Sequence, residues 1–513
     1  MKSILDYIKK KILYPFEKDL FYFLLLWGVI SFPNCYSQKN DITYVIYLLM
    51  MYYIVAYIVV FIINLNQIVA KIIKPIILVF LALISLLNLY CFINYNSLLS
   101  FDYIQIIMAT NLNEIIEFFA TYLSWEELFL FTLVIAIIFF IAFKLPKLQR
   151  IKIGWTWMVA FFFLLMSIGA IYHNSGIIKE EFKDKELWDF RFDEVVDLRC
   201  HLTHPKIEEC DSIHPKNIVI ILGESFSSNH SSLYGYEKCT NPLLAKQEEL
   251  GNLLVFKNVT SPCTSTIASF RYLLNTYSIN CKDEKPWYDY TNIIETMKVA
   301  GYHTAWISNQ AEKGMCDNIP GNYAKICDET FFLENEKGDD RFDGRLLSYR
   351  LSKHHEYNCI FYHLMGQHGS FKERYPKEYE VFNEKDYSAY PPHQRDILAS
   401  YDNATLYNDY VVNSIMELYK DQDAIVFYFP DHALDIFDTD PDYFGHARKT
   451  NASQTQGKKI PFVIYVSPFF KKLHFNKIDM MRKTVVNSYC TDTFIYAVMD
   501  ATGFRFVDSG GYN

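Results

Sequence analysis

The sequence predicts an N-terminal domain of five transmembrane α-helices, followed by an external α/β domain with a mostly parallel central sheet. Five long segments that almost lack charged residues lie in the first part of the 513-residue chain. After them, short apolar runs alternate with longer polar stretches, which is typical of strands and crossover connections. We therefore expect a membrane domain at 1–173, a linker at 174–215 and the external domain at 216–513.

The two parts differ in charge. The whole chain has a net charge of −9, from 49 Lys and Arg against 58 Asp and Glu. Residues 1–173 contain 12 basic and 9 acidic residues, a balance of +3, so the remainder carries −12. An acidic balance gives no electrostatic footprint for nucleic acid, which we exclude as a partner. A hydrophobic fraction of 51% also excludes a disordered chain.

Each apolar segment has the composition of a membrane span, for which roughly 20 apolar residues are needed. Leu128–Phe143 is short, but Trp125 and Lys144 beside it suit the two membrane interfaces. The alternative, a buried soluble core, is disfavoured because one core cannot hide five such runs. The predicted spans are Leu20–Gln38, Ile42–Ala70, Pro75–Phe101, Leu128–Phe143 and Ile153–Ile178.

Basic residues set the predicted orientation of the spans. They gather at the N-terminus and in the second-to-third and fourth-to-fifth connections, which we place on the cytoplasmic side. The third-to-fourth connection has no Lys or Arg, so we place it outside. With a cytoplasmic N-terminus and five spans, everything after Tyr172 also lies outside. Within that connection, Phe101–Leu123 has apolar residues at helical spacing and contains Glu114. It suits a helix on the outer membrane surface, and the alternative is a simple connector.

The external domain contains five short apolar runs that are typical of strands. Ligands of such sheets bind beyond the carboxyl ends of the strands, so the residues just after each run are the candidates for chemistry. The runs are Asn217–Leu222, Tyr302–Ile307, Tyr357–Leu364, Ala424–Phe429 and Pro461–Val466. Acidic, amide, lysine and imidazole groups lie in or just after the first four, and they are Glu224, Asn309, Lys313, His363, His368, Asp431 and His432, with His446 further along the chain.

Glu224, Asp431 and His432 offer two carboxylates and one imidazole, a ligand set that suits Zn²⁺ better than Mn²⁺. Alone, the Asp431-His432 pair would also fit a turn with a capping aspartate. The histidines at 363, 368 and 446 suit a second metal or a charged substrate, as in phosphoryl transfer.

A hydroxyl-rich stretch, TSPCTSTIASF at Thr260–Phe270, precedes a predicted helix at Ile267–Asn275. A hydroxyl at a helix start beside a metal is activated as a nucleophile for a phosphoryl group. An ordinary N-cap cluster is the alternative. Spacing leaves four candidate nucleophiles, which are Ser261, Thr264, Ser265 and Thr266.

Together these segments resemble the phosphoethanolamine transferases of bacterial inner membranes, a family that includes the mobile colistin resistance enzymes. The resemblance covers nearly the whole chain and implies an alkaline-phosphatase/sulfatase fold for the external, periplasmic domain. The segments that carry it are GESFSSNHSSLYGY, TSPCTSTIASF, HLMGQHG, YDNATLYNDYVV, FPDHALD with FGHAR, and ATNLNE in the loop between the third and fourth spans.

The resemblance also implies residue roles. Thr266 would be the nucleophile, and Glu224, Thr266, Asp431 and His432 would hold one catalytic zinc ion. His368 and His446 would bind the substrate phosphate or a second zinc. The substrate contacts it implies are His363, Asn309 and Lys313 for phosphoethanolamine and Glu114 for the lipid headgroup.

The expected reaction transfers phosphoethanolamine from phosphatidylethanolamine to lipopolysaccharide, at lipid A or a core sugar, through a phospho-threonine intermediate. One of His363, His368 and His446 would act as the general base. An added amine on an anionic glycolipid would weaken binding of cationic peptides such as polymyxin. The alternatives are a phosphoglycerol transferase of the lipoteichoic acid synthase type and a degenerate relative that binds lipid headgroups. A sulfatase activity is disfavoured because no Cys/Ser-x-Pro-x-Arg motif is present.

The chain departs from the family pattern at three places, one of which is the absence of an Arg from the GESFSS segment. Ala433-Leu434 stands where the family has Gly-Glu, and Asp435 is the candidate replacement for the missing carboxylate. Pro262-Cys263 replaces a Cys-Gly pair before the nucleophile. Nine of the 11 cysteines lie in the external part, where disulfides form in an oxidising compartment. From proximity in sequence we expect the pairs Cys316–Cys327, Cys200–Cys210 and Cys263–Cys281.

Overall fold

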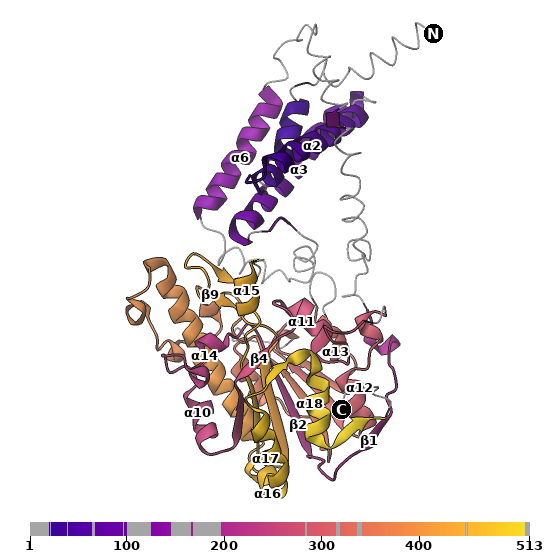
Figure 1. Ribbon diagram of the computed structural model, residues 1–513, viewed down its shortest axis with the longest axis vertical. Coiled ribbons are helices and arrows are strands. Elements are labelled where there is room, and N and C mark those ends of the chain that lie inside the picture. The colour runs from indigo at the N-terminus through magenta and orange to yellow at the C-terminus, as the bar shows by residue number, and fades with distance from the viewer. Residues whose placement is uncertain are drawn as a thin grey trace. The chain divides into compact units, whose positions relative to one another are not determined.

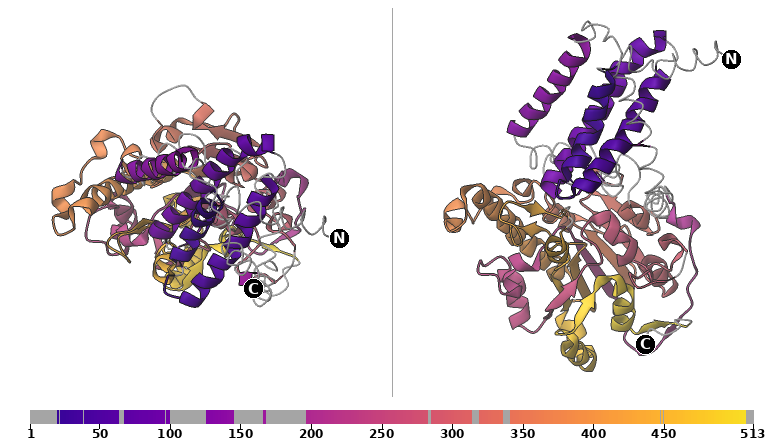
Figure 2. Two further views of the ribbon diagram at one scale, coloured as in Figure 1. Left: turned by 90° about the horizontal axis from the view of Figure 1, so that it is seen from above. Right: turned by 45° about the horizontal axis from the view of Figure 1, so that its top comes forward.

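The computed structural model describes residues 20, 22–37, 39–63, 67–95, 97–99, 125–144, 166–167, 196–282, 285–313, 319–335, 341–446, 448 and 450–507. These residues form two compact units (Figures 1 and 2). The described residues up to 167 make a helical unit, and those from 196 onward make an α/β unit.

The helical unit contains apolar helices that overlap four of the predicted spans. The predicted end of the second span and start of the third are wrong, because one helix ends at Ile63 and the next begins at Gln67. Two of them, covering Ile42–Ile63 and Ile72–Tyr95, are long and apolar enough to cross a membrane. Only 33% and 22% of their apolar windows are buried, whereas a core helix of a soluble protein would be mostly buried. The helices are residues 22–37, α2 (Ile42–Ile63), α3 (Gln67–Tyr95) and α6 (Trp125–Lys144).

Two predictions about the membrane part concern residues that lie largely outside the described ones. The fifth span, 153–178, lies outside the described residues except for 166–167, and Glu114 with its loop lies outside them entirely. The number five therefore stays a prediction.

Aromatic side chains join the first helix to α2. The indole nitrogen of Trp27 donates a hydrogen bond to the Leu49 carbonyl at 2.8 Å. The ring of Tyr53 meets Phe23 edge-on at 4.9 Å and Trp27 at 5.4 Å. Edge-to-face pairs of this kind add about 0.5–1.5 kcal/mol beyond area burial.

A seven-stranded sheet forms the centre of the α/β unit. Its order is β3-β11-β8-β2-β7-β5-β6, and β8, β2, β7, β5 and β6 run parallel, whereas β11 is antiparallel to both of its neighbours. The strands are β2 (Asn217–Gly223), β3 (Leu253–Phe256), β5 (His303–Ser308), β6 (Glu329–Phe332), β7 (Asn358–His363), β8 (Ala424–Pro430) and β11 (Phe462–Val466). All five predicted strands are confirmed, and β3 and β6 are additional.

Both faces of the sheet are buried, as expected for parallel strands. Along β2, Ile218, Ile220 and Leu222 belong to one apolar core, while Val219 and Ile221 belong to the other. Residues of α10 (Pro242–Glu249) and α14 (Pro392–Leu418) complete the second core. The first core is completed by α11 (Thr266–Leu273), α12 (Ile293–Val299), α13 (Ile319–Ala324), α16 (Pro468–Leu473), α17 (Phe475–Thr484) and α18 (Phe494–Thr502).

Short strand pairs and one short helix decorate this framework (Figure 1). The pairs are antiparallel except β4 with β12. They consist of β1 (Ile207–Glu209) with β13 (Phe504–Phe506), β4 (Asn258–Thr260) with β12 (Ser488–Cys490), and β9 (Asp435–Ile436) with β10 (Phe444–Gly445), and the helix is α15 (Asn451–Gln456).

The predicted disulfides are not borne out within the described residues. Cys200, Cys210 and Cys281 take part in no disulfide, so the pairs Cys200–Cys210 and Cys263–Cys281 are wrong. Closeness in sequence does not ensure the Cβ separation of about 3.5–4.5 Å that a disulfide needs. Cys316 lies outside the described residues, and Cys327 joins no described cysteine.

Candidate active site

Three predicted metal ligands meet at the carboxyl ends of neighbouring strands. Glu224 follows β2, and Asp431 and His432 follow β8, which pairs with β2 in parallel. One ligand atom from each lies within 4.8 Å of the others, and all three side chains are buried. His432 Nε2 lies 3.2 Å from Glu224 Oε1 and 3.8 Å from Asp431 Oδ2. The expectation that strand ends bring these residues together is confirmed.

The charges in this cluster are strongly coupled. Burial raises the pKa of Glu224, but the hydrogen bond and charge of His432 outweigh it, so the Glu224 pKa lies below its usual value. Burial and the negative charge of Glu224 raise the pKa of Asp431 to about 7. Burial lowers the pKa of His432, but the charge of Asp431 and the bond to Glu224 raise it to about 9.

The same cluster suits a divalent cation. Asp431 Oδ2 is buried and accepts no hydrogen bond within the described part of the chain. Two carboxylates with only one imidazole between them leave excess negative charge in a dry site, which is costly without a cation. Glutamate, aspartate and histidine are all good zinc ligands, so these residues fit Zn²⁺.

The Thr266 hydroxyl lies directly at the cluster. Thr266 is the first residue of α11, and its Oγ1 donates a hydrogen bond to Glu224 Oε2 at 3.2 Å and lies 3.5 Å from His432 Nε2. Ser261, another candidate, instead donates to the Cys263 carbonyl at 2.7 Å. The geometry therefore favours Thr266 among the hydroxyls that the sequence left open.

Three further histidines surround the cluster. The ring of His446 lies 4.7 Å from that of His432, and the charge of Glu224 acts on His363, His368 and His446 alike. Burial lowers the pKa of His363 and His368 to about 4 and that of His446 to about 3. His363 Nε2 and His368 Nδ1 are buried without a hydrogen-bond partner in the described residues. Neutral imidazoles with open nitrogens can accept protons or bind cations.

We expect the buried His363 to make the metal-free protein acid-sensitive. An unfolded histidine binds a proton near pH 6.5, whereas native His363 does so near pH 4. The unfolded state thus binds more protons between these values, and stability falls as pH decreases through them. His363 alone should remove about 2 kcal/mol between pH 7 and pH 5. Chelator-treated His363→Phe protein should show a weaker pH dependence of its unfolding midpoint, and an unchanged dependence would contradict the assignment.

The sequence did not predict the residues that position Glu224. Ser225 Oγ donates to Glu224 Oε1 at 2.6 Å, and Gln310 Nε2 donates to Glu224 Oε2 at 3.2 Å and to the Leu364 carbonyl at 2.9 Å. They lie shortly after strands β2 and β5 respectively, and this position at the carboxyl edge is the one signal that singles them out. Such outer contacts orient metal ligands.

The loop after β2 has a strained backbone held in place by α14. Ser225 has φ of +58°, which is rare for a residue other than glycine. The Tyr401 hydroxyl donates to the Ser225 carbonyl at 2.8 Å and accepts from the Ser227 amide at 2.9 Å. Gly366, with φ of +51°, packs so closely that a Cβ there would lie 2.9 Å from the Glu224 backbone. Strain of this kind persists where the surroundings over-determine the conformation.

We expect Gln310→Ala to weaken zinc binding without unfolding the domain. Loss of the amide frees Glu224 Oε2 from one of its two described donors, and the loss of such an outer contact typically costs about 10–100-fold in metal affinity or activity. Competition with a chromophoric chelator measures the affinity. Gln454→Ala is the matched control, because the hydrogen bond that Gln454 Nε2 donates within the described residues goes to the Arg448 carbonyl and not to Glu224. Equal affinities in the two variants would refute the positioning role.

The remaining predicted residues are placed differently. Asn309 Nδ2 donates to Asp343 Oδ1 at 2.7 Å and to the Arg341 carbonyl at 2.8 Å, so its amide nitrogen serves the local structure. Lys313 is exposed. Asp435 accepts from the amides of Asp438 and Thr439, so its carboxylate is used within its own turn. The substrate roles of Asn309 and Lys313 stay predictions.

Comparison with known proteins matches residues 216–504 to the sulfatase family. The chain is 28% identical over 303 residues to phosphoethanolamine transferase EptC of Escherichia coli O18:K1:H7, a match that covers 57% of this chain and 52% of the relative. The chain thus spans about half the length of the curated relatives it matches.

Solved structures extend the comparison. The crystal structure of the C-terminal periplasmic domain of EptC from Escherichia coli in complex with Zn matches with a TM-score of 0.53 and 25% identity, covering 60% of this chain and 87% of that chain. The integral membrane protein lipooligosaccharide phosphoethanolamine transferase A from Neisseria meningitidis matches with a TM-score of 0.62 and 16% identity, covering 94% and 95%. The second likeness shows a shared fold.

Proposed function

Because the chain belongs to the sulfatase family, we propose that it is a zinc-dependent transferase that moves phosphoethanolamine from phosphatidylethanolamine to lipopolysaccharide. The observation that carries this proposal is the Thr266 hydroxyl, 3.2 Å from Glu224 and 3.5 Å from His432 within a metal-ligand cluster. The relative at 28% identity is named a phosphoethanolamine transferase, and a structural relative was crystallised with Zn. The acceptor is lipid A or a core sugar.

Glu224, Thr266, Asp431 and His432 would hold one catalytic zinc, which supplies Lewis-acid activation of a hydroxyl and neutralises phosphate charge. Thr266 Oγ1 forms a bond to phosphorus as the phosphorus–oxygen bond to diacylglycerol breaks. The threonine proton passes to a nearby imidazole and then to the departing alkoxide. An acceptor hydroxyl next attacks the phosphorus of the phospho-threonine and gives its proton to a histidine. The bond between phosphorus and Thr266 Oγ1 breaks, and the histidine passes the proton to Oγ1, which restores the threonine hydroxyl.

The three histidines have proposed roles in proton transfer and in binding phosphate or a second zinc. The ring of His446 lies near that of His432, and the pKa values of His363, His368 and His446 are all lowered by burial, so each is neutral at pH 7 and able to accept a proton. We assign the general base to this set, and phosphate binding or a second zinc to His368 and His446. Lys313 and Asn309 complete the headgroup contacts in this proposal, with Glu114 at the lipid.

The membrane part of the proposal is a five-span domain at 1–173, joined by a linker at 174–215 to a periplasmic catalytic domain at 216–513. Two apolar helices with exposed apolar faces support it, and so does the description of the Neisseria relative as an integral membrane protein. Anchoring in the bacterial inner membrane would keep the active site near its lipid donor. The added amine would reduce the negative charge of the outer surface and hence polymyxin binding.

The test is intact mass and peptide mapping of the purified full chain after incubation with zinc and phosphatidylethanolamine. We expect a phosphoethanolamine adduct on Thr266. An adduct formed only from phosphatidylglycerol would instead indicate a phosphoglycerol transferase of the lipoteichoic acid synthase type. Bound zinc without an adduct from either donor would overturn the transferase proposal in favour of a lipid-headgroup-binding relative.

A further inference from the structure

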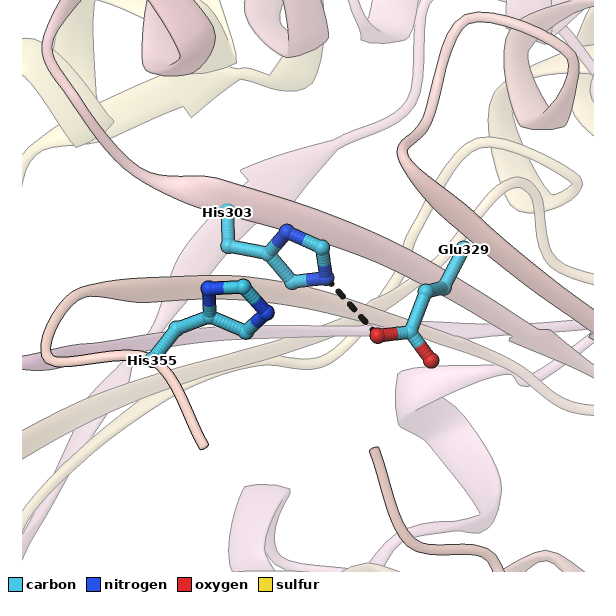
Figure 3. Close-up of side chains that lie close together, drawn as sticks. All are labelled: His303, Glu329 and His355. Atoms are coloured by element: carbon cyan, nitrogen blue, oxygen red, sulfur yellow. Dashed lines mark hydrogen bonds and ion pairs between the residues drawn. The ribbon is translucent and has the colours of Figure 1, made fainter. Parts of the chain in front are cut away.

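A second group of potential metal ligands lies at the opposite edge of the central sheet. His303 is the first residue of β5, Glu329 is the first residue of β6, and His355 lies shortly before β7. Because these strands are parallel, their first residues lie at the amino edge, whereas Glu224 and Asp431 follow the carboxyl ends. The group His303, Glu329 and His355 is therefore separate from the catalytic cluster (Figure 3).

The three side chains hold their ligand atoms close together. One ligand atom from each lies within 4.8 Å of the others. His303 Nε2 lies 2.9 Å from Glu329 Oε1, and the two imidazole rings stack with centroids 3.7 Å apart and an interplanar angle of 7°. Figure 3 shows a nitrogen of the His355 ring on the side that faces the Glu329 carboxylate, beside the His303 nitrogen. Tetrahedral zinc requires ligand atoms about 3.3 Å apart, so the spacing suits one ion, and the two rings would turn out of their parallel stack to direct their in-plane lone pairs at it.

Neighbouring groups hold Glu329 and His303 in this orientation. Glu329 Oε2 accepts from the Tyr349 hydroxyl at 3.1 Å and from the Ser352 amide at 3.0 Å, which directs Oε1 toward the histidines. The other ring nitrogen of His303 faces Asp328 Oδ2 at 3.7 Å. Asp328 is itself fixed by bonds from Thr304. A carboxylate behind a ligating histidine and fixed ligand carboxylates are the outer shell that protein metal sites use.

An ion pair between His303 and Glu329 uses only one of the two stacked rings. A second protonated ring stacked face to face with the first would repel it. A divalent cation would instead use both rings together with the carboxylate. Two histidines and one carboxylate are a ligand set for zinc and related divalent transition metals, with one position left for water.

We propose that His303, Glu329 and His355 form a second, structural site for a divalent transition metal of the zinc class. The ion joins the starts of β5 and β6 to the segment before β7, and so stabilises the outer strands of the sheet. All three residues are partly exposed, which lets a cation enter from solvent. This site does not depend on the proposed catalytic function, because its hydrogen bonds and ion pairs within the described chain involve neighbours at the amino edge and not the catalytic cluster.

The test compares zinc content after dialysis of the full chain in detergent. We expect His355→Gln and Glu329→Gln each to lose about one zinc ion per chain relative to the unaltered protein, while the Thr266 adduct persists. His354→Gln is the matched control, because His354 is the exposed neighbour of His355 and lies outside the group. Equal zinc content in all three variants would overturn the proposal.

A second measurement needs no substitution. Diethyl pyrocarbonate modifies free imidazoles, and peptide mapping resolves each histidine. At zinc about ten times above the dissociation constant, we expect about tenfold slower modification of His303 and His355 and an unchanged rate at His354. Modification of His303 and His355 that zinc does not slow would contradict the site, even if the catalytic histidines were protected.

Discussion

Thr266→Ala is expected to abolish transfer and the covalent adduct together. The hydroxyl that contacts Glu224 and His432 is the nucleophile in the proposed reaction, and alanine leaves no oxygen at this position. Loss of a nucleophile lowers turnover by at least about 10³-fold. Single-turnover transfer from labelled phosphatidylethanolamine measures the rate, and intact mass measures the adduct. Thr266→Ser should restore part of both, because serine retains the hydroxyl.

Ser265→Ala is the matched control for this substitution. Ser265 precedes Thr266 at the N-cap of α11 and its side chain makes no capping hydrogen bond, so its loss should leave the helix and the reaction nearly unchanged. Zinc content should be retained in Ser265→Ala. If Thr266→Ala still acquired the adduct while Ser265→Ala did not, the nucleophile would be reassigned to Ser265.

Asp431→Asn is expected to remove zinc and activity while making the metal-free domain more stable. An amide is a poor zinc ligand, so transfer should fall by at least about 10³-fold. Without metal, burial of Asp431 and its repulsion from Glu224 raise its pKa to about 7. The unfolded chain releases this proton near pH 3.9, so ionisation destabilises the native state increasingly between pH 4 and pH 7.

The stability gain should therefore depend on pH. At pH 8, chelator-treated Asp431→Asn should be more stable than the unaltered protein by about 4 kcal/mol, and the difference should shrink at pH 5. Adding zinc should reverse the order at pH 8, because only the unaltered protein gains from binding at this site. Asp442→Asn, at an exposed position, should change neither quantity. A less stable metal-free Asp431→Asn at pH 8 would contradict the repulsion between the two carboxylates.

The predicted strands were accessible from sequence because four of them are nearly continuous apolar runs and β5 has the apolar centre Ala305–Ile307. Strand β6 was not predicted from the sequence, because its short sequence ETFF mixes polar and apolar residues at the sheet edge. The family resemblance and the sulfatase-like fold predicted from the motifs are confirmed.

The convergence of Glu224, Asp431 and His432 was equally predictable, since parallel strands fix where their ends meet. The contacts of Gln310, Ser225 and Asn309 were not predictable. They depend on loop conformations, which the periodic pattern of apolar residues in a sequence does not indicate. The disulfide pairs failed for a similar reason. Separation along the chain says little about the relative direction of two Cβ atoms.

The strained loop at Ser225, fixed by Tyr401 and by Gly366, has a consequence for how substitutions far along the chain act on the site. In a zinc finger the ion assembles its own ligands, and folding waits for metal. Here the fold itself contributes to the placement of Glu224, because Tyr401 of α14 and the close approach of Gly366 hold the loop that carries it. The position of Glu224 is therefore inherited from the packing of α14 as well as from its own strand.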